Sequence, residues 1–143
     1  MENYKKQFAE FLVSAEALQF GEFTLKSGRV SPYFFNSSKF NTGPLIDQLG
    51  QYYASVIKQH APDCSLVYGP AYNGIPLCVT VATALSKKLN RNIGYFFNRK
   101  EIKTHGDQGT LFHTVQSHQY TRKFSLTEFP NKVYGLDFGM AIS

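Results

Sequence analysis

The chain has 143 residues, of which 43% are hydrophobic and 15% aromatic, a composition typical of one globular domain and not of a disordered chain. No apolar run reaches the roughly 18 residues that span a bilayer, and no apolar stretch follows the first residues as in a signal peptide. Cys64 and Cys78 exclude a disulfide framework and indicate reduced thiols. We therefore expect a cytoplasmic protein that does not enter a membrane. The net charge of +5 fits anionic partners, whether nucleic acid, a membrane surface or a phosphorylated small molecule.

The N-terminal segment predicts a helix followed by a hairpin. Residues 3–18 repeat apolar side chains at spacings of three and four, as in an amphipathic helix. Residues 23–26 then alternate, Ser27-Gly28 is a turn signal, and residues 33–35 are aromatic strand material.

The middle of the chain predicts a βαβ unit. A helix over 42–60 is followed by a short apolar strand over 65–68, a helix over 74–89 and a strand over 93–97. Two strands joined through a helix in this way lie parallel in one sheet.

The C-terminal part has a different character. Residues 98–109 read as a polar loop, and residues 111–143 show neither a helical period nor clean alternation, apart from a possible strand near 132–134. We therefore divide the chain into a domain over 1–110 and a divergent tail over 111–143.

Three segments carry side chains that suit a phosphorylated ligand. The strand-to-helix turn over 68–74 contains glycines and precedes a helix N-terminus, which attracts anions; an ordinary βα turn would show the same pattern. The loop over 98–106 holds cations and a histidine that could clamp phosphate oxygens, or it is a solvated basic loop. The hairpin residues 23–36 combine a lysine with aromatics that could hold a planar anion, or the aromatics are core residues. His60, His113 and His118 lack metal-ligand spacing.

Four strings in this order and spacing resemble the orotate phosphoribosyltransferase family. They are Phe20-Gly21-Glu22-Phe23-Thr24-Leu25-Lys26-Ser27-Gly28-Arg29, Ser31-Pro32-Tyr33-Phe34-Phe35-Asn36, Gly69-Pro70-Ala71-Tyr72, and Phe97-Asn98-Arg99-Lys100-Glu101 with Lys103 and His105-Gly106. The resemblance covers roughly residues 1–110. It implies a type I phosphoribosyltransferase fold of class α/β, in which helices flank a parallel sheet and an N-terminal hood region precedes it.

The resemblance also implies an activity. Orotate attacks C1 of phosphoribosyl pyrophosphate in a Mg²⁺-dependent reaction that gives orotidine 5′-monophosphate and pyrophosphate. Such catalysis depends on positioning and on stabilising the leaving pyrophosphate. Family analogy assigns catalytic roles in a mobile loop, substrate-binding roles, and a homodimer in which the loop reaches the partner's site. The catalytic residues would be Lys100, Lys103 and His105; the substrate-binding residues would be Lys26, Phe34, Phe35, Tyr72, Asn73 and Arg99.

Two departures from the family pattern are visible. Asn73 stands where the family usually has lysine, which removes a unit charge from the donor site. Residues 111–143 also lack the acidic pair and the Thr/Gly-rich turn that hold the donor's ribose phosphate in the family. We therefore expect a fold that is incomplete at the C-terminus, through truncation or a frameshift near residue 110, with an exposed sheet edge.

Two other readings follow from these departures and from the charge. The chain could be an inactive remnant that binds orotate or pairs with an intact copy. A basic nucleic-acid-binding domain is disfavoured, because no helix-turn-helix or ribonucleoprotein string is present, and we expect no nucleic-acid partner.

Overall fold

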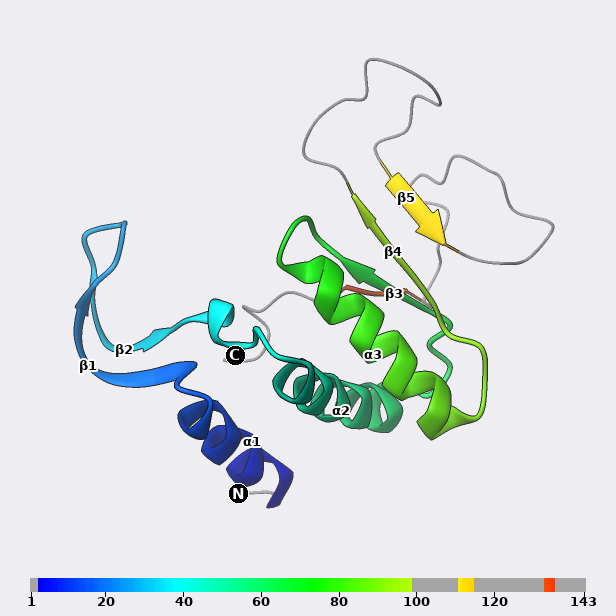
Figure 1. Cartoon of the computed structure of the whole chain (residues 1–143), viewed down its shortest axis with the longest axis horizontal. Helices are drawn as coiled ribbons and strands as arrows, with labels where there is room; N and C mark the ends of the chain where they lie inside the picture. Colours follow the sequence, from blue (N-terminus) through cyan, green and yellow to red (C-terminus); the bar gives the residue numbers. More distant parts are fainter. Residues whose placement is uncertain (1–2, 99–110, 115–132, 136–143) are drawn as a thin grey trace, which may run out of the picture. The chain divides into compact units, whose positions relative to one another are not determined.

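The computed structural model describes residues 3–98, 111–114 and 133–135, which form two compact units, Met1–Ile46 and Asp47–Ser143 (Figure 1). Each unit is described by itself. The elements in chain order are α1 (Asn3–Ser14), β1 (Leu18–Thr24), β2 (Val30–Phe35), the 3₁₀ turn η1 (Ser37–Lys39), α2 (Gly43–His60), β3 (Leu66–Gly69), α3 (Gly74–Leu89), β4 (Gly94–Asn98), β5 (Leu111–Thr114) and β6 (Val133–Gly135).

The first unit consists of α1 and an antiparallel hairpin of β1 and β2. The helix ends at Ser14, four residues before the expected end at 18, because Glu16 takes a left-handed φ of 56°. Lys39 of η1 donates a hydrogen bond of 2.9 Å to the Glu16 carboxylate and lowers its pKa. The chain leaves the hairpin through Asn36, whose N–H donates to the Ala17 carbonyl at 2.7 Å. These bonds fix the point where helix and hairpin meet.

The second unit is built on a four-stranded sheet of order β5-β4-β3-β6. β3 and β4 are parallel, with Gly69 opposite Phe97, as the βαβ pattern predicted. β6 pairs with the other side of β3, also in parallel, whereas β5 runs antiparallel to β4. The strand expected near 132–134 is confirmed at Val133–Gly135. Because β6 pairs with β3 on the side away from β4, β3 is an internal strand of the sheet and not an edge strand.

Helix α3 packs on β3 and β4 (Figure 1) and supplies half of the largest fully buried side chains described for this unit. Among the described residues of this unit, the largest fully buried side chains come from α2, β3, α3 and the loop before β3: Leu49, Ile57, Cys64, Val67, Leu77, Cys78, Val81 and Leu85. A Cβ on Gly50 of α2 would lie 2.5 Å from the Thr80 Cγ2 of α3. The absence of a side chain at Gly50 therefore lets the two helices approach closely.

Arg91 binds the loop between α2 and β3. Its guanidinium donates to the carbonyl oxygens of Pro62 at 2.9 Å and of Cys64 at 2.6 Å. Arg91 lies just after Asn90, the left-handed C-cap of α3, so these bonds join the end of α3 to the loop before β3. Within the described residues, no helix is long and apolar enough to cross a bilayer.

Candidate functional site

The turn between β3 and α3 is held by two glycines that touch. A Cβ on Gly69 would lie 2.1 Å from the Gly74 carbonyl oxygen, and a Cβ on Gly74 would lie 2.6 Å from Pro70 Cδ. Both distances are far below any real contact, so this turn requires glycine at both ends. The peptide bond between Ala71 and Tyr72 is cis. The glycines therefore serve backbone packing, which was one of the two readings of this segment.

The backbone N–H groups of the turn are largely engaged inside the protein. The Gly74 N–H donates to the Pro70 carbonyl at 2.9 Å, and the Ile75 N–H donates to the Tyr72 carbonyl at 3.2 Å. The Ala71 N–H donates to Asn98 Oδ1 at 2.8 Å, and Pro76 has no N–H. A cradle made from many backbone N–H groups, as expected of a phosphate-binding loop, is thus reduced at this turn.

The exposed groups of the turn are the side chains of Tyr72 and Asn73. Tyr72 is 55% exposed. Asn73 occupies the N-cap position of α3 in a helical conformation, and its side chain makes no capping hydrogen bond. The Asn73 amide is therefore available to a ligand beside the positive end of the helix dipole.

The residues under the turn are apolar and neutral. Burial raises the pKa of Tyr68, whose ring packs on Phe96 with centroids 4.9 Å apart. Burial also raises the pKa of the Cys78 thiol to about 11. Neither group supplies a negative charge below the turn at neutral pH, which is compatible with an anion bound above it.

Lys26 lies at the tip of the hairpin in the first unit. The tip is closed by hydrogen bonds from the Leu25 N–H to the Arg29 carbonyl (2.9 Å) and from the Gly28 N–H to the Leu25 carbonyl (2.8 Å). Gly28 has a φ of 81°, which favours glycine. Lys26 is exposed at this tip.

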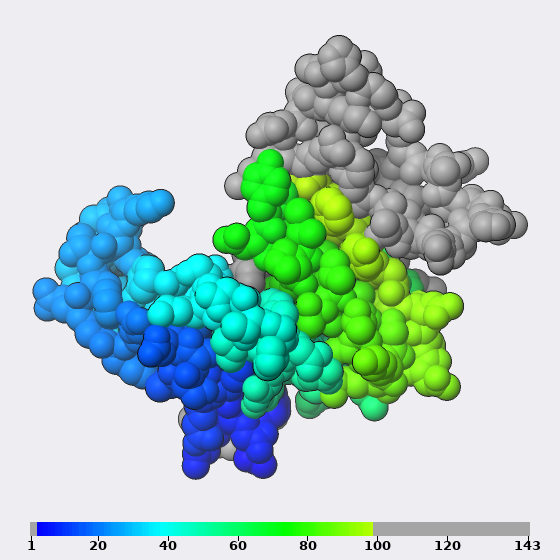
Figure 2. All heavy atoms as spheres, in the orientation of Figure 1, coloured from blue at the N-terminus to red at the C-terminus, as the bar shows by residue number. Residues whose placement is uncertain are grey.

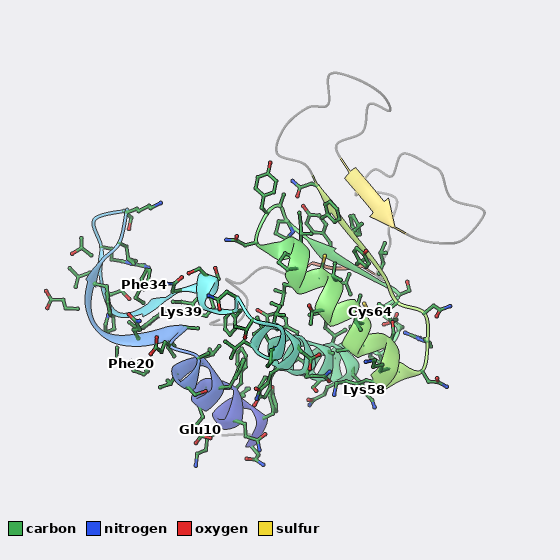
Figure 3. The ribbon with its side chains drawn as sticks, viewed as in Figure 1. Glu10, Phe20, Phe34, Lys39, Lys58 and Cys64 are labelled. Atoms are coloured by element: carbon green, nitrogen blue, oxygen red, sulfur yellow. The ribbon has the colours of Figure 1, made fainter. Side chains whose placement is uncertain are left out.

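Phe34 and Phe35 belong to the same strand and face opposite sides of it. Phe34 is 40% exposed and packs against Phe23 with ring centroids 5.6 Å apart, and Figure 3 labels it on the hairpin together with Phe20. Phe35 packs against buried Phe40 at 6.3 Å. The exposed ring of Phe34 can stack on a planar ligand, whereas Phe35 contributes to the core of its unit.

The remaining site predictions concern the segment that follows β4. Arg99, Lys100, Lys103 and His105 lie outside the described residues. Of the described candidates, Lys26, Phe34 and Phe35 belong to the first unit, and Tyr72 and Asn73 to the second. Their assignment to substrate stays a prediction.

A metal cluster does not emerge from the part of the chain that the structure describes: no group of three His, Cys, Asp or Glu side chains gathers there. Mg²⁺ commonly binds through substrate phosphates and one or two carboxylates. The described residues therefore provide no protein cage for Mg²⁺, and we derive no catalytic step through it.

Asn98 belongs to the fourth string of the family resemblance, and no functional role was predicted for it. Its side chain contacts the turn from 27 residues away. The signal available in the sequence was its position: Asn98 ends the strand beside the one that enters the turn.

Comparison with known proteins places these segments among relatives. The chain is 51% identical over 111 residues to an orotate phosphoribosyltransferase of Serratia proteamaculans and 52% identical over 111 residues to that of Mannheimia succiniciproducens. In both cases the match covers 78% of this chain and 52% of the relative. The chain thus spans about half the length of the curated relatives it matches. No family model matches it.

A solved structure gives the same result for the fold. The orotate phosphoribosyltransferase of Francisella tularensis superposes with a TM-score of 0.64 at 43% identity, over 76% of this chain and 50% of that one. The matched length agrees with the roughly 110 residues over which the resemblance was found.

Proposed function

Because the chain belongs to the orotate phosphoribosyltransferase family over the matched residues, we propose that it acts in orotate phosphoribosyl transfer. In this reaction orotate displaces pyrophosphate from C1 of phosphoribosyl pyrophosphate and yields orotidine 5′-monophosphate. The observation that carries the proposal is the 51% identity over 111 residues. An identity of this size preserves the local geometry of the matched segments.

The turn between β3 and α3 is the proposed site for the pyrophosphate of the donor. Its support is the exposed pair Tyr72 and Asn73 at the N-terminus of α3, where backbone dipoles favour an anion. Asn73 offers a hydrogen bond but no charge. We therefore propose weaker donor binding than a lysine at this position would give.

The hairpin is the proposed site for orotate. Lys26 would neutralise the carboxylate, and the exposed ring of Phe34 would stack on the pyrimidine. Arg99, Lys100, Lys103 and His105 are proposed to neutralise the departing pyrophosphate. Mg²⁺ dependence, a homodimer and a cytoplasmic location are part of the same proposal, and they rest on the resemblance.

The second candidate is a chain that binds orotate without turning it over. It is favoured by one observation, that the match covers 52% of the relative. The first experiment measures the formation of orotidine 5′-monophosphate from orotate and phosphoribosyl pyrophosphate in the presence of Mg²⁺. The control is the same reaction without added Mg²⁺. Turnover supports the enzyme; binding of orotate without turnover supports the second candidate; neither binding nor turnover by a folded chain overturns both.

A further inference from the structure

Asn98 occupies a place where one side chain can fix the proposed pyrophosphate turn. It is the last residue of β4, directly after Phe97, and Phe97 lies opposite Gly69, where the turn begins. Since β3 and β4 are parallel, both strands end at the same edge of the sheet. Asn98 therefore lies beside the turn although it is 27 positions from Ala71 in the sequence.

The donor and the acceptor of the hydrogen bond between Asn98 and the turn are both defined. The Ala71 N–H can only donate, so the atom that accepts it at 2.8 Å must be the amide oxygen of Asn98. Asn98 is half-buried. Without this acceptor a partly buried backbone N–H would lose its partner, which is unfavourable.

The hydrogen bond acts at a point of the turn that the glycines do not fix. The contact of Gly69 with Gly74 and the bond from the Gly74 N–H to the Pro70 carbonyl hold the two ends together. Ala71 lies between these ends and directly precedes Tyr72 and Asn73. The hydrogen bond to Ala71 thus limits the positions that the exposed side chains of Tyr72 and Asn73 can take.

We propose that Asn98 is a positioning residue that sets the conformation of the turn so that Tyr72 and Asn73 meet a pyrophosphate group. The ligand part of this inference rests on the proposed function. Asn98 itself does not contact the ligand in this scheme; it acts through the backbone of Ala71.

The test compares four chains by two measurements. The chains are the wild type, Asn98→Ala, Asn98→Asp and Asn92→Ala; Asn92 is an exposed asparagine of the same unit and serves as the matched control. The first measurement is amide hydrogen exchange at Ala71, read by NMR. The second is the dissociation constant for inorganic pyrophosphate, measured by calorimetry.

In Asn98→Ala, exchange at Ala71 should accelerate by about tenfold, the factor that corresponds to one hydrogen bond, and pyrophosphate should bind more weakly by a similar factor. Asn98→Asp retains the acceptor oxygen and should keep Ala71 exchange slow, while its added negative charge weakens pyrophosphate binding. Asn92→Ala should match the wild type in both measurements. If Asn98→Ala does not fold, Asn98→Ser takes its place.

Unchanged exchange at Ala71 in Asn98→Ala would overturn the positioning role. Faster exchange with unchanged pyrophosphate affinity would overturn the link to the ligand. Absence of pyrophosphate binding by the wild type would overturn the proposed function of the turn, whereas the exchange measurement would still decide whether Asn98 holds it.

Discussion

The two units of the chain bury their apolar side chains to different extents. Within the part of the chain that the structure describes, the eight largest fully buried side chains all belong to the unit Asp47–Ser143. Of the six large hydrophobic residues found exposed among the described residues, five belong to Met1–Ile46: Val13, Phe20, Val30, Tyr33 and Phe34. In the space-filling view the hairpin is part of the blue region at the left (Figure 2).

This difference indicates that the second unit contributes mainly to stability and that the first unit offers a surface for binding. A two-stranded hairpin has little stability of its own, and exposed apolar side chains of this size are typical of surfaces that bind. The buried core around α3 can hold the turn rigid. We therefore expect substitutions in the second unit to change the free energy of unfolding, and substitutions on the hairpin to change binding.

The largest expected effect is the loss of a core side chain from α3. Leu77→Ala should lower the free energy of unfolding by about 3 kcal/mol, because Leu77 is fully buried and its removal leaves a cavity. Phe20→Ala, at a residue 72% exposed, should change it by less than about 0.5 kcal/mol. Urea denaturation followed by circular dichroism measures both. Equal changes in the free energy of unfolding would show that the two units do not differ in this way.

A somewhat smaller effect is expected at the turn. Gly69→Ala places a Cβ 2.1 Å from the Gly74 carbonyl oxygen, and relief of this clash should cost about 2 kcal/mol of stability. Gly43→Ala is the control, because a Cβ at Gly43 meets no atom within 4 Å and Gly43 begins α2. It should be neutral or stabilising by about 0.5 kcal/mol. A Gly69→Ala chain as stable as the Gly43→Ala chain would contradict the close contact.

The pairing of β6 with β3 is expected to contribute less. Tyr134 lies opposite Val67 in a parallel ladder, and Tyr134→Pro should weaken that ladder and lower the midpoint of urea unfolding, at a cost of about 1 kcal/mol. Tyr134→Thr retains strand preference and controls for loss of the ring. If both variants unfold at the wild-type midpoint, β6 adds nothing to the stability of the second unit.

The smallest expected effect is a change of ligand affinity without a change of fold. Asn73→Lys adds a positive charge at an exposed position beside the helix N-terminus. Pyrophosphate should bind about fivefold more tightly, as expected of an exposed ion pair of about 1 kcal/mol, and the gain should shrink at high salt. Calorimetry at two salt concentrations measures it. An unchanged affinity would argue against an anion at this turn.

The order and type of the helices and strands up to Asn98 could be predicted from the sequence, but the first strand, expected over 23–26, lies at Leu18–Thr24, and the 3₁₀ turn η1 was not expected. The end of α1 could not be predicted: Ala15 and Leu18 continue the helical spacing, yet the left-handed Glu16 and its bond to Lys39 redirect the chain. β5 was not expected, since Leu111–Thr114 offers four residues and is specified by pairing with β4. The boundary between the units at residue 46 also has no sequence signal.

The candidate site could be predicted in part. Glycine at 69 and 74 follows from the turn, but the use of the Ala71 N–H by Asn98 depends on which strands are neighbours. The opposite orientations of Phe34 and Phe35 follow from strand alternation. Which of the two rings is exposed depends on the packing of Phe35 against Phe40.

The burial of both cysteines has a practical consequence. Cys64 and Cys78 are the two cysteines of the chain, both are buried, and the thiol of Cys78 has a pKa of about 11. Such thiols react slowly with maleimides near neutral pH. A cysteine introduced at the hairpin tip, for example at Ser27, would therefore take a fluorescent dye selectively. The native sequence therefore needs no removal of cysteines before the hairpin is studied by fluorescence with and without added orotate.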